Sequence, residues 1–246
     1  MIFYFSATGN SRHAAHRIAE SIGDRAILVT DCLKNEKFNF IAHPDEKIGF
    51  VCPVYSLGLP VTVTDFIKRL NLKHGNNYIF TCVTFGSFSG GATKMLNSLL
   101  NEKGIRVNAA YSVRMPDTWT PFYDVSDKDK IRKRNEKADK NINRIIKHIK
   151  RSDHGNYDFR RLPFCDTFYK DYDNIRKTSS LSVTECCTGC GKCAESCPVD
   201  AIEIRNNKPV WVKEKCAMCL GCLHRCPEFA IQRGEKTALH GQYIHL

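Results

Sequence analysis

Two cysteine runs, CTGCGKCAESCP and CAMCLGCLHRCP, constrain this chain of 246 residues more than any other feature. Each run holds three cysteines separated by two residues, a fourth cysteine three residues further on, and then a proline. The runs repeat at a fixed offset, because Cys187 maps onto Cys216, 29 residues later. A compact inorganic cluster needs four thiolates around it, and a tight glycine-containing loop can point three of them inward. Structural zinc is the alternative, but zinc sites usually pair two C-x-x-C units into one tetrahedron.

The repeat resembles the bacterial two-cluster ferredoxin over about residues 181 to 235. In such ferredoxins the fourth cysteine of each run ligates the other cluster. The resemblance therefore implies two [4Fe-4S] clusters with crossed ligand sets. The first set is Cys187, Cys190, Cys193 and Cys226. The second set is Cys216, Cys219, Cys222 and Cys197.

The 13 cysteines come without an export signal, which indicates a reducing compartment and predicts a cytoplasmic protein without a disulfide framework. Cys186 stands beside a predicted ligand, but the two-residue spacing to Cys190 selects Cys187. The uncharged stretch 48–64 contains Pro53, Gly58 and Pro60, so it is a poor membrane helix. We therefore expect no membrane partner.

The net charge of +11 is concentrated in one part of the chain. Residues 126–180 carry +7 (16 basic minus 9 acidic), against +3 (13 minus 10) for 1–125 and +1 (8 minus 7) for 181–246. Nucleic-acid binding is one interpretation of a basic protein. However, thiolate ligation leaves an oxidised cluster with a net charge of about −2, so the assembled protein is less basic than its sequence. We expect an acidic redox partner protein and no nucleic acid.

Residues 1–113 alternate apolar runs with helical patterns. The expected strands are 1–5, 26–29, 47–52, 78–83 and 105–113, and this alternation predicts an α/β doubly wound parallel sheet of five strands. No convincing second helix is evident in 31–46. Ser126 is expected to cap a basic helix that runs to about Lys150 with Ala138 and Ile142 on its apolar face. Its basic side is either a solvated face or a docking surface for an acidic partner.

Three loops follow the carboxyl ends of expected strands, where open α/β sheets bind ligands. The first loop opens a helix and offers backbone N–H groups and hydroxyls without a lysine, which suits a terminal phosphate. It consists of Ser6, Ala7, Thr8, Gly9, Asn10 and Ser11. This hexapeptide resembles the flavodoxin phosphate loop, and the resemblance implies bound FMN. It also implies two ring-contacting loops, which would be formed by Pro53, Val54, Tyr55, Ser56, Leu57 and Gly58, and by Thr84, Phe85, Gly86, Ser87, Gly90 and Gly91.

The whole chain resembles a flavodoxin–ferredoxin fusion of the kind called the EFR1-family ferredoxins. The resemblance implies a flavodoxin-like domain at 1–151, a linker at 152–180 and a small α+β ferredoxin-like domain at 181–246. One hypothesis is an electron carrier in which FMN exchanges electrons with both clusters and a partner protein, without a catalytic acid or base. The alternative is a reductase, in which a small-molecule substrate binds over the flavin in a pocket lined by Tyr55, Trp119 and the 115–125 loop, and the clusters feed the flavin with electrons. Tyr55 is the candidate for stacking on the ring.

Overall fold

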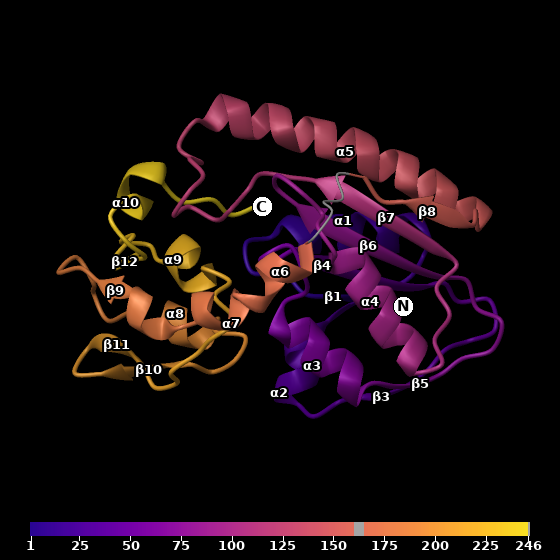
Figure 1. The fold of residues 1–246 in the computed structure, drawn as a ribbon, viewed down its shortest axis with the longest axis horizontal. Coiled ribbons are helices and arrows are strands. Elements are labelled where there is room, and N and C mark those ends of the chain that lie inside the picture. The colour runs from indigo at the N-terminus through magenta and orange to yellow at the C-terminus, as the bar shows by residue number, and fades with distance from the viewer. Residues whose placement is uncertain (160–164, 246) are drawn as a thin grey trace.

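The computed structural model describes residues 1–159 and 165–245. Its largest unit is a parallel sheet in the order β2-β1-β4-β6-β7-β8 (Figure 1). The strands are β1 (Ile2–Tyr4), β2 (Ala26–Leu28), β4 (Ile48–Pro53), β6 (Ile79–Phe85), β7 (Ala109–Arg114) and β8 (Gly155–Tyr157). Each neighbouring pair runs parallel. The predicted doubly wound α/β sheet is confirmed.

Helices cover both faces of this sheet, which explains why its central strands are continuous apolar runs. On one face α1 (Asn10–Ser21) and α5 (Lys128–Arg151) bury Ile18 and Ile142 against Tyr111. On the other face lie α2 (Val29–Lys34), α3 (Val61–Arg69) and α4 (Ala92–Glu102), which bury Phe66 and Leu96. Strands β1, β4 and β6 all end at the same edge, so the loops that follow them lie together.

The structure differs from the sequence-based expectation at three places. The sheet has a sixth strand, β8, which comes from the segment predicted to be a linker. A short helix, α2, overlaps the stretch 31–46, where none was expected; it buries Cys32 in the core. The cap of α5 is Asp127 and not Ser126, because the Asp127 carboxylate accepts from Lys130 N at 2.9 Å.

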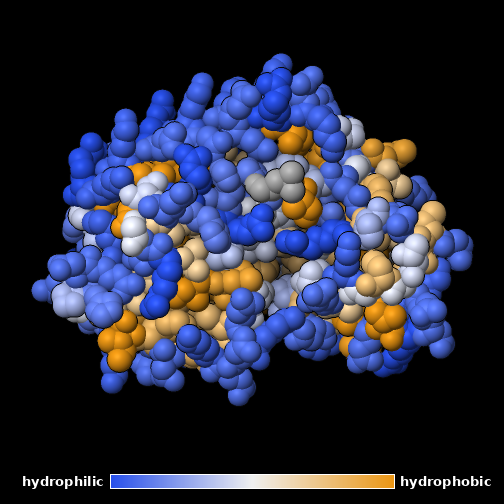
Figure 2. All heavy atoms as spheres, turned by 180° about the vertical axis from the view of Figure 1, so that it is seen from behind, coloured by the Kyte–Doolittle hydropathy of each residue, from blue (hydrophilic) through white to orange (hydrophobic). Residues whose placement is uncertain are grey.

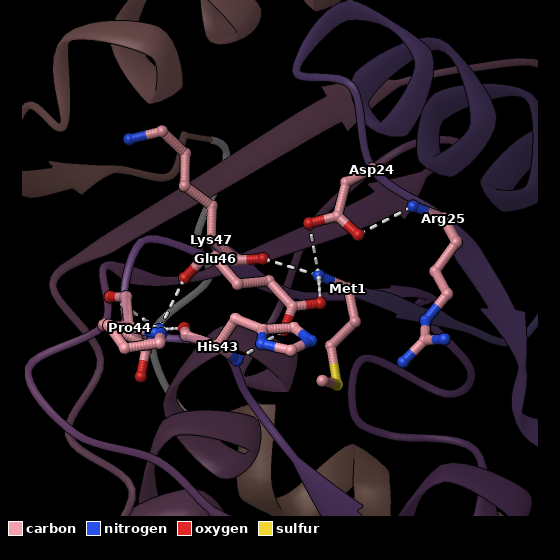
Figure 3. A network of polar contacts seen from close by, with 8 residues as sticks. Met1, Asp24, Arg25, His43, Pro44, Glu46 and Lys47 are labelled. Atoms are coloured by element: carbon pink, nitrogen blue, oxygen red, sulfur yellow. Dashed lines mark hydrogen bonds and ion pairs between the residues drawn. The ribbon is translucent and has the colours of Figure 1, made fainter.

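Polar contacts fix the start of β1 (Figure 3). The Met1 nitrogen donates to Asp24 Oδ2 at 2.5 Å, to Glu46 Oε1 at 2.8 Å and to the Lys47 carbonyl at 2.8 Å. Asn77 holds the adjoining turn by donating to the Glu46 carbonyl at 2.7 Å. These bonds hold the start of β1 beside the start of β4.

The C-terminal part is a small α+β unit built around the cysteine runs (Figure 1). Two antiparallel pairs, β9 (Ser182–Val183) with β12 (Ile231–Gln232) and β10 (Ile202–Arg205) with β11 (Lys208–Trp211), enclose α8 (Lys192–Glu195) and α9 (Gly221–Arg225). It is joined to the sheet by α6 (Cys165–Lys170), α7 (Tyr172–Ile175) and a 3-10 turn (Thr178–Ser180), and it ends with α10 (Thr237–His240). A parallel pair, β3 (Asn39–Ile41) with β5 (Asn71–Lys73), flanks the large sheet.

The outer side of α5 is basic. Its apolar residues face the sheet, and the opposite side forms part of a hydrophilic edge of the molecule (Figure 2). The exposed cations on this helix are Lys128, Lys130, Arg132, Lys133, Lys137, Lys140, Arg144, Lys147, Lys150 and Arg151. None of the helices in the described part of the chain is both long and apolar enough to cross a membrane.

Candidate flavin and iron–sulfur site

The predicted phosphate loop lies between β1 and the N-terminus of α1. Ser6 Oγ accepts from Gly9 N at 3.1 Å, and the Ser11 hydroxyl is buried against Thr84 Oγ1 at 2.8 Å. The Asn10 amide donates to the Pro116 carbonyl at 3.0 Å. Ser11 and Asn10 therefore tie the loop to its neighbours. The hydroxyls of Ser6 and Thr8 and the N–H groups at the start of α1 are the neutral donors that a phosphate would use.

The conformation of this loop requires a glycine at position 9. The φ of Gly9 is +95°, in the left-handed region that side chains rarely adopt. A β-carbon at this position would also collide with the carbonyl oxygen of His245, which comes from the C-terminal segment. The C-terminal segment, more than 230 positions away in sequence, thus packs directly against the phosphate loop. The sequence pattern does not reveal this contact.

The two other predicted loops meet at the same edge. Tyr55 and Gly58 exchange backbone hydrogen bonds at 3.0 and 2.8 Å, which makes a tight turn. Within it Ser56 and Leu57 have φ values of +48° and +63°. The Leu57 carbonyl accepts from Gly91 N at 2.8 Å, so the second and third loops are joined.

These loops form one wall of an open cavity of about 240 Å³. Six of the residues predicted to contact flavin line it: Val54, Tyr55, Ser56, Leu57, Gly86 and Ser87. Its other lining residues come from the loop after β6, from the 115–125 loop and from the C-terminal half: Phe88, Asp117, Thr118, Trp119, Tyr123, Tyr172, Ile175, Met218 and Cys219. Its aromatic side chains suit a flat ring.

Other predicted residues support this wall without lining the cavity. Pro53 and Phe85 end β4 and β6, and Thr84 holds Ser11. Gly58 closes the Tyr55 turn, as described above, and Gly90 and Gly91 pack on Leu57. Sequence reasoning missed Tyr172 and Met218, because only the folded chain brings their segments to the loops.

A second cavity lies beside the phosphate loop. Ser6 and Ala7 line it from the sheet side, and Arg225 lines it from α9. Cys219 lines both cavities, so the phosphate-loop end and the aromatic end meet at one cysteine side chain. FMN has a phosphate at one end and a ring at the other; the aromatic cavity suits the ring, and the second cavity offers the phosphate the donors of Ser6 and Arg225, with Asp31 and Glu195 also on its wall.

Burial shifts the acidity of two side chains on the cavity wall. Burial is the main cause that raises the pKa of Tyr55 well above its ordinary value, and the charge of a neighbouring Cys219 thiolate raises it further. Burial also raises the pKa of Asp117, although its carboxylate accepts from Trp119 N at 3.1 Å and from Ser87 Oγ at 3.3 Å. Asp117 is therefore an acidic group held on the wall of the aromatic cavity.

The cysteine runs surround two further small cavities. The first is lined by Cys187, Cys190, Cys193 and Cys226. The second is lined by Cys197, Cys216, Cys219 and Cys222. Each grouping takes three cysteines from one run and the fourth from the other. In the described residues no three ligating side chains are gathered as tightly as a single metal ion would need.

The backbone follows the internal repeat closely. Gly189 and Gly191 have φ values of +72° and +78°, and the residues 29 positions later, Met218 and Leu220, have values of +46° and +54°. Backbone N–H groups donate to Cys197 Sγ and Cys226 Sγ, both at 3.3 Å, and to Cys216 Sγ at 3.2 Å. Such N–H···S bonds favour thiolates and tune cluster potentials.

The two cysteine sets differ in their surroundings. Cys190 is exposed, whereas Cys197 and Cys216 are buried. Burial raises the pKa of Cys219 to about 12, so its thiolate would need the positive charge of iron to form. The second set faces the flavin-loop cavity, and the first set lies nearer to solvent.

The two halves of the chain are joined through α9 and the segment after α10. His224 Nε2 lies 2.9 Å from the Thr118 carbonyl, and burial lowers the pKa of His224 to about 4, so its ring is neutral and Nε2–H donates. Arg233 stacks on the Trp119 ring, with its guanidinium carbon 4.6 Å from the centroid. Trp119 therefore both lines the cavity and packs on the C-terminal half.

Known structures share only a weak likeness with the chain. Rubredoxin oxygen:oxidoreductase from the anaerobe Desulfovibrio gigas is 18% identical with a TM-score of 0.35, and the match covers 59% of this chain and 35% of that one. A Bacteroides uniformis protein described as a flavoprotein is 17% identical with a TM-score of 0.34, covering 48% and 90%. A flavone reductase is 9% identical with a TM-score of 0.35, covering 63% and 66%. No curated protein matches the chain.

Two families match the chain directly. A flavodoxin domain matches residues 1–143, more than half of the chain, and a 4Fe-4S dicluster domain matches residues 181–227. The first match covers strands β1, β2, β4, β6 and β7 of the sheet and all three loops, and the second covers all eight cysteines of the two sets. The chain therefore belongs to the flavodoxin-domain family and carries a 4Fe-4S dicluster domain behind it.

Proposed function

We propose that this protein is an intramolecular electron relay, in which FMN exchanges electrons with two [4Fe-4S] clusters and the clusters exchange them with a partner protein. One observation carries the proposal. Cys219, from the second cysteine set, lines the same cavity as Tyr55 and Trp119. A flavin ring in that cavity would lie against a cluster ligand.

The order of the carriers follows from burial. The set of Cys197, Cys216, Cys219 and Cys222 reaches the flavin cavity through Cys219, whereas Cys187, Cys190, Cys193 and Cys226 line a separate cavity. The first set includes the exposed Cys190. The route therefore runs from FMN to the inner cluster, then to the outer cluster, and from there to the partner.

The combination of one flavin with two clusters suits the number of electrons that each cofactor carries. A flavin can hold two electrons, whereas each cluster passes one at a time, so two clusters in series allow the flavin to be filled or emptied in single steps. The protein supplies the positions: the loops after β1, β4 and β6 hold FMN, and the eight cysteines hold the clusters. The relay requires no acid or base from a side chain.

For the partner we propose an acidic redox protein in a reducing, cytoplasmic compartment. The exposed cations of α5 support this choice, because a basic face speeds diffusional encounter with an acidic protein. Salt should therefore slow electron delivery to the partner without slowing transfer inside the molecule.

Anaerobic purification followed by rapid mixing tests the relay. The protein should contain about eight iron atoms per chain and release FMN on denaturation. After chemical reduction of the clusters, bleaching of the flavin should proceed at a rate independent of protein concentration. A rate that falls on dilution would mean transfer between molecules, and colourless protein would remove the basis of the proposal.

A second candidate is the reductase of a small molecule, and the acidic side chain on the wall of the aromatic cavity favours it. The cavity is open and carries the carboxyl group of Asp117 beside Tyr123. A small substrate over the ring would meet an acidic side chain there. A panel of small two-electron acceptors tests this function: oxidation of the reduced protein should saturate with one of them, and Asp117→Asn should lower that rate but leave the transfer from clusters to flavin intact.

A further inference from the structure

The phosphate loop contains no cation of its own, yet a cation from the other half of the chain is bound to it. Arg225, at the end of α9, donates to the Ala7 carbonyl through Nε at 3.1 Å and through a terminal nitrogen at 2.9 Å. The two residues are 218 positions apart. This contact brings a permanent positive charge to the cavity that Ser6 and Ala7 line.

Arg225 differs from the other cation of this cavity. Lys34 is paired with Asp200 at 3.1 Å. Arg225 forms no ion pair with any residue in 1–159 or 165–245, and its only hydrogen-bond acceptor there is the neutral Ala7 carbonyl. Its charge is thus available for a ligand, and a guanidinium can bind two phosphate oxygens at once.

We propose that Arg225 binds the phosphate of FMN, so that the ferredoxin half supplies the charge that the phosphate loop lacks. The inference rests on the proposed function, since it assumes FMN in the cavities beside Cys219. A phosphate held by backbone N–H groups and hydroxyls alone keeps much of its charge uncompensated, and a guanidinium at the loop offsets it.

The position of Arg225 links the two cofactor sites. It lies between Cys222 and Cys226, which belong to different cysteine sets. A chain whose cysteines hold no cluster would not fix α9, and would hold Arg225 less firmly at Ala7. FMN affinity should therefore depend on cluster assembly, and the coupling must act equally in both directions.

The test compares FMN with riboflavin, which has the same ring but no phosphate. Dissociation constants are measured with the cluster-loaded protein under anaerobic conditions for the wild type, for Arg225→Gln and for a control, Arg205→Gln. Arg205 is exposed on β10 and pairs with Glu203 at 2.8 Å, away from the loop. Iron content is measured in each sample, so that only matched cluster loading is compared.

We expect Arg225→Gln to weaken FMN binding by about 10- to 100-fold, as for loss of a charged hydrogen bond, and to leave riboflavin binding within about twofold. The salt dependence of FMN binding should also decrease. Equal weakening of FMN and riboflavin binding would show that Arg225 only holds the two halves together, and would overturn the inference. An unchanged dissociation constant for FMN in Arg225→Gln would also overturn the inference, and would leave the proposed function standing. A wild type that binds neither ligand would instead remove the proposed function.

Discussion

The hydroxyl of Tyr243 donates a 2.8 Å hydrogen bond to the side-chain oxygen of Asn10, although 233 residues separate the two. Asn10 opens α1 and belongs to the phosphate loop, and Tyr243 is buried in the segment after α10. The same segment reaches α9 through Gln242, whose amide donates to the Cys226 carbonyl at 2.7 Å. Residues 241–245 therefore connect the phosphate loop to a predicted cluster ligand.

Tyr243→Phe should lower the free energy of unfolding by about 1–3 kcal/mol, because it leaves the buried Asn10 oxygen without this donor. FMN binding should weaken as well, since Asn10 helps to shape the loop. Chemical denaturation and fluorescence titration measure the two effects. The matched control is Tyr157→Phe, whose hydroxyl bonds the His154 carbonyl on a side chain that is 40% exposed. Equal losses of stability and of FMN binding in the two variants would contradict the role given to the bond between Tyr243 and Asn10.

Gly9→Ala should abolish tight FMN binding. Alanine at φ +95° is strained, by about 1–2 kcal/mol, and its β-carbon would also push against the His245 carbonyl. Gly23→Ala separates the backbone strain from the collision with His245. Gly23 has a φ of +69° with open space around it, so alanine there is strained but meets no neighbouring atom. We expect that variant to lose stability without losing FMN. Isothermal titration of both proteins checks this, and retention of FMN by Gly9→Ala would exclude the predicted role of the loop.

Serine substitutions should separate the two clusters. Cys219→Ser should remove the inner cluster, lower the iron content to roughly half, and stop transfer between flavin and the remaining cluster. Cys190→Ser should damage the outer cluster and leave the first transfer intact. The exposed Cys186 is the control, and Cys186→Ser should keep about eight iron atoms. Iron analysis and rapid mixing distinguish the three; loss of clusters from Cys186→Ser would reassign the ligand.

Asp117 should make stability depend on pH in a defined direction. Burial raises its pKa in the folded protein above the ordinary value of about 3.9, so the folded state binds the proton more tightly than the unfolded chain does. The stability that this group contributes is fully present below about pH 3.9 and is lost as pH rises through the folded pKa. The free energy of unfolding of the wild type, relative to Asp117→Asn, should therefore fall over that window. A difference in unfolding free energy between the wild type and Asp117→Asn that stays constant over this pH range would contradict a raised pKa for Asp117.

The sequence predicts the sheet well because its buried strands are apolar runs between glycine and proline signals. Strand β8 escaped prediction because Gly155–Tyr157 is short and exposed, with no periodic pattern. The phosphate loop and the cysteine sets are local motifs, and local motifs can be found without a structure. Arg225 at Ala7, Tyr243 at Asn10 and Tyr172 on the cavity wall cannot be found that way, because each contact joins segments that only the folded chain brings together.

The left-handed positions of the cysteine repeat have a consequence for how its two copies can change. The outer copy has glycine at both positions, where this backbone conformation costs little. The inner copy keeps Met218 and Leu220 there, at a strain of about 1–2 kcal/mol each, and both side chains are buried, with Met218 on the cavity wall. The two copies are therefore not interchangeable: the outer copy has a relaxed backbone at these positions, and the inner copy keeps two strained residues whose side chains are buried.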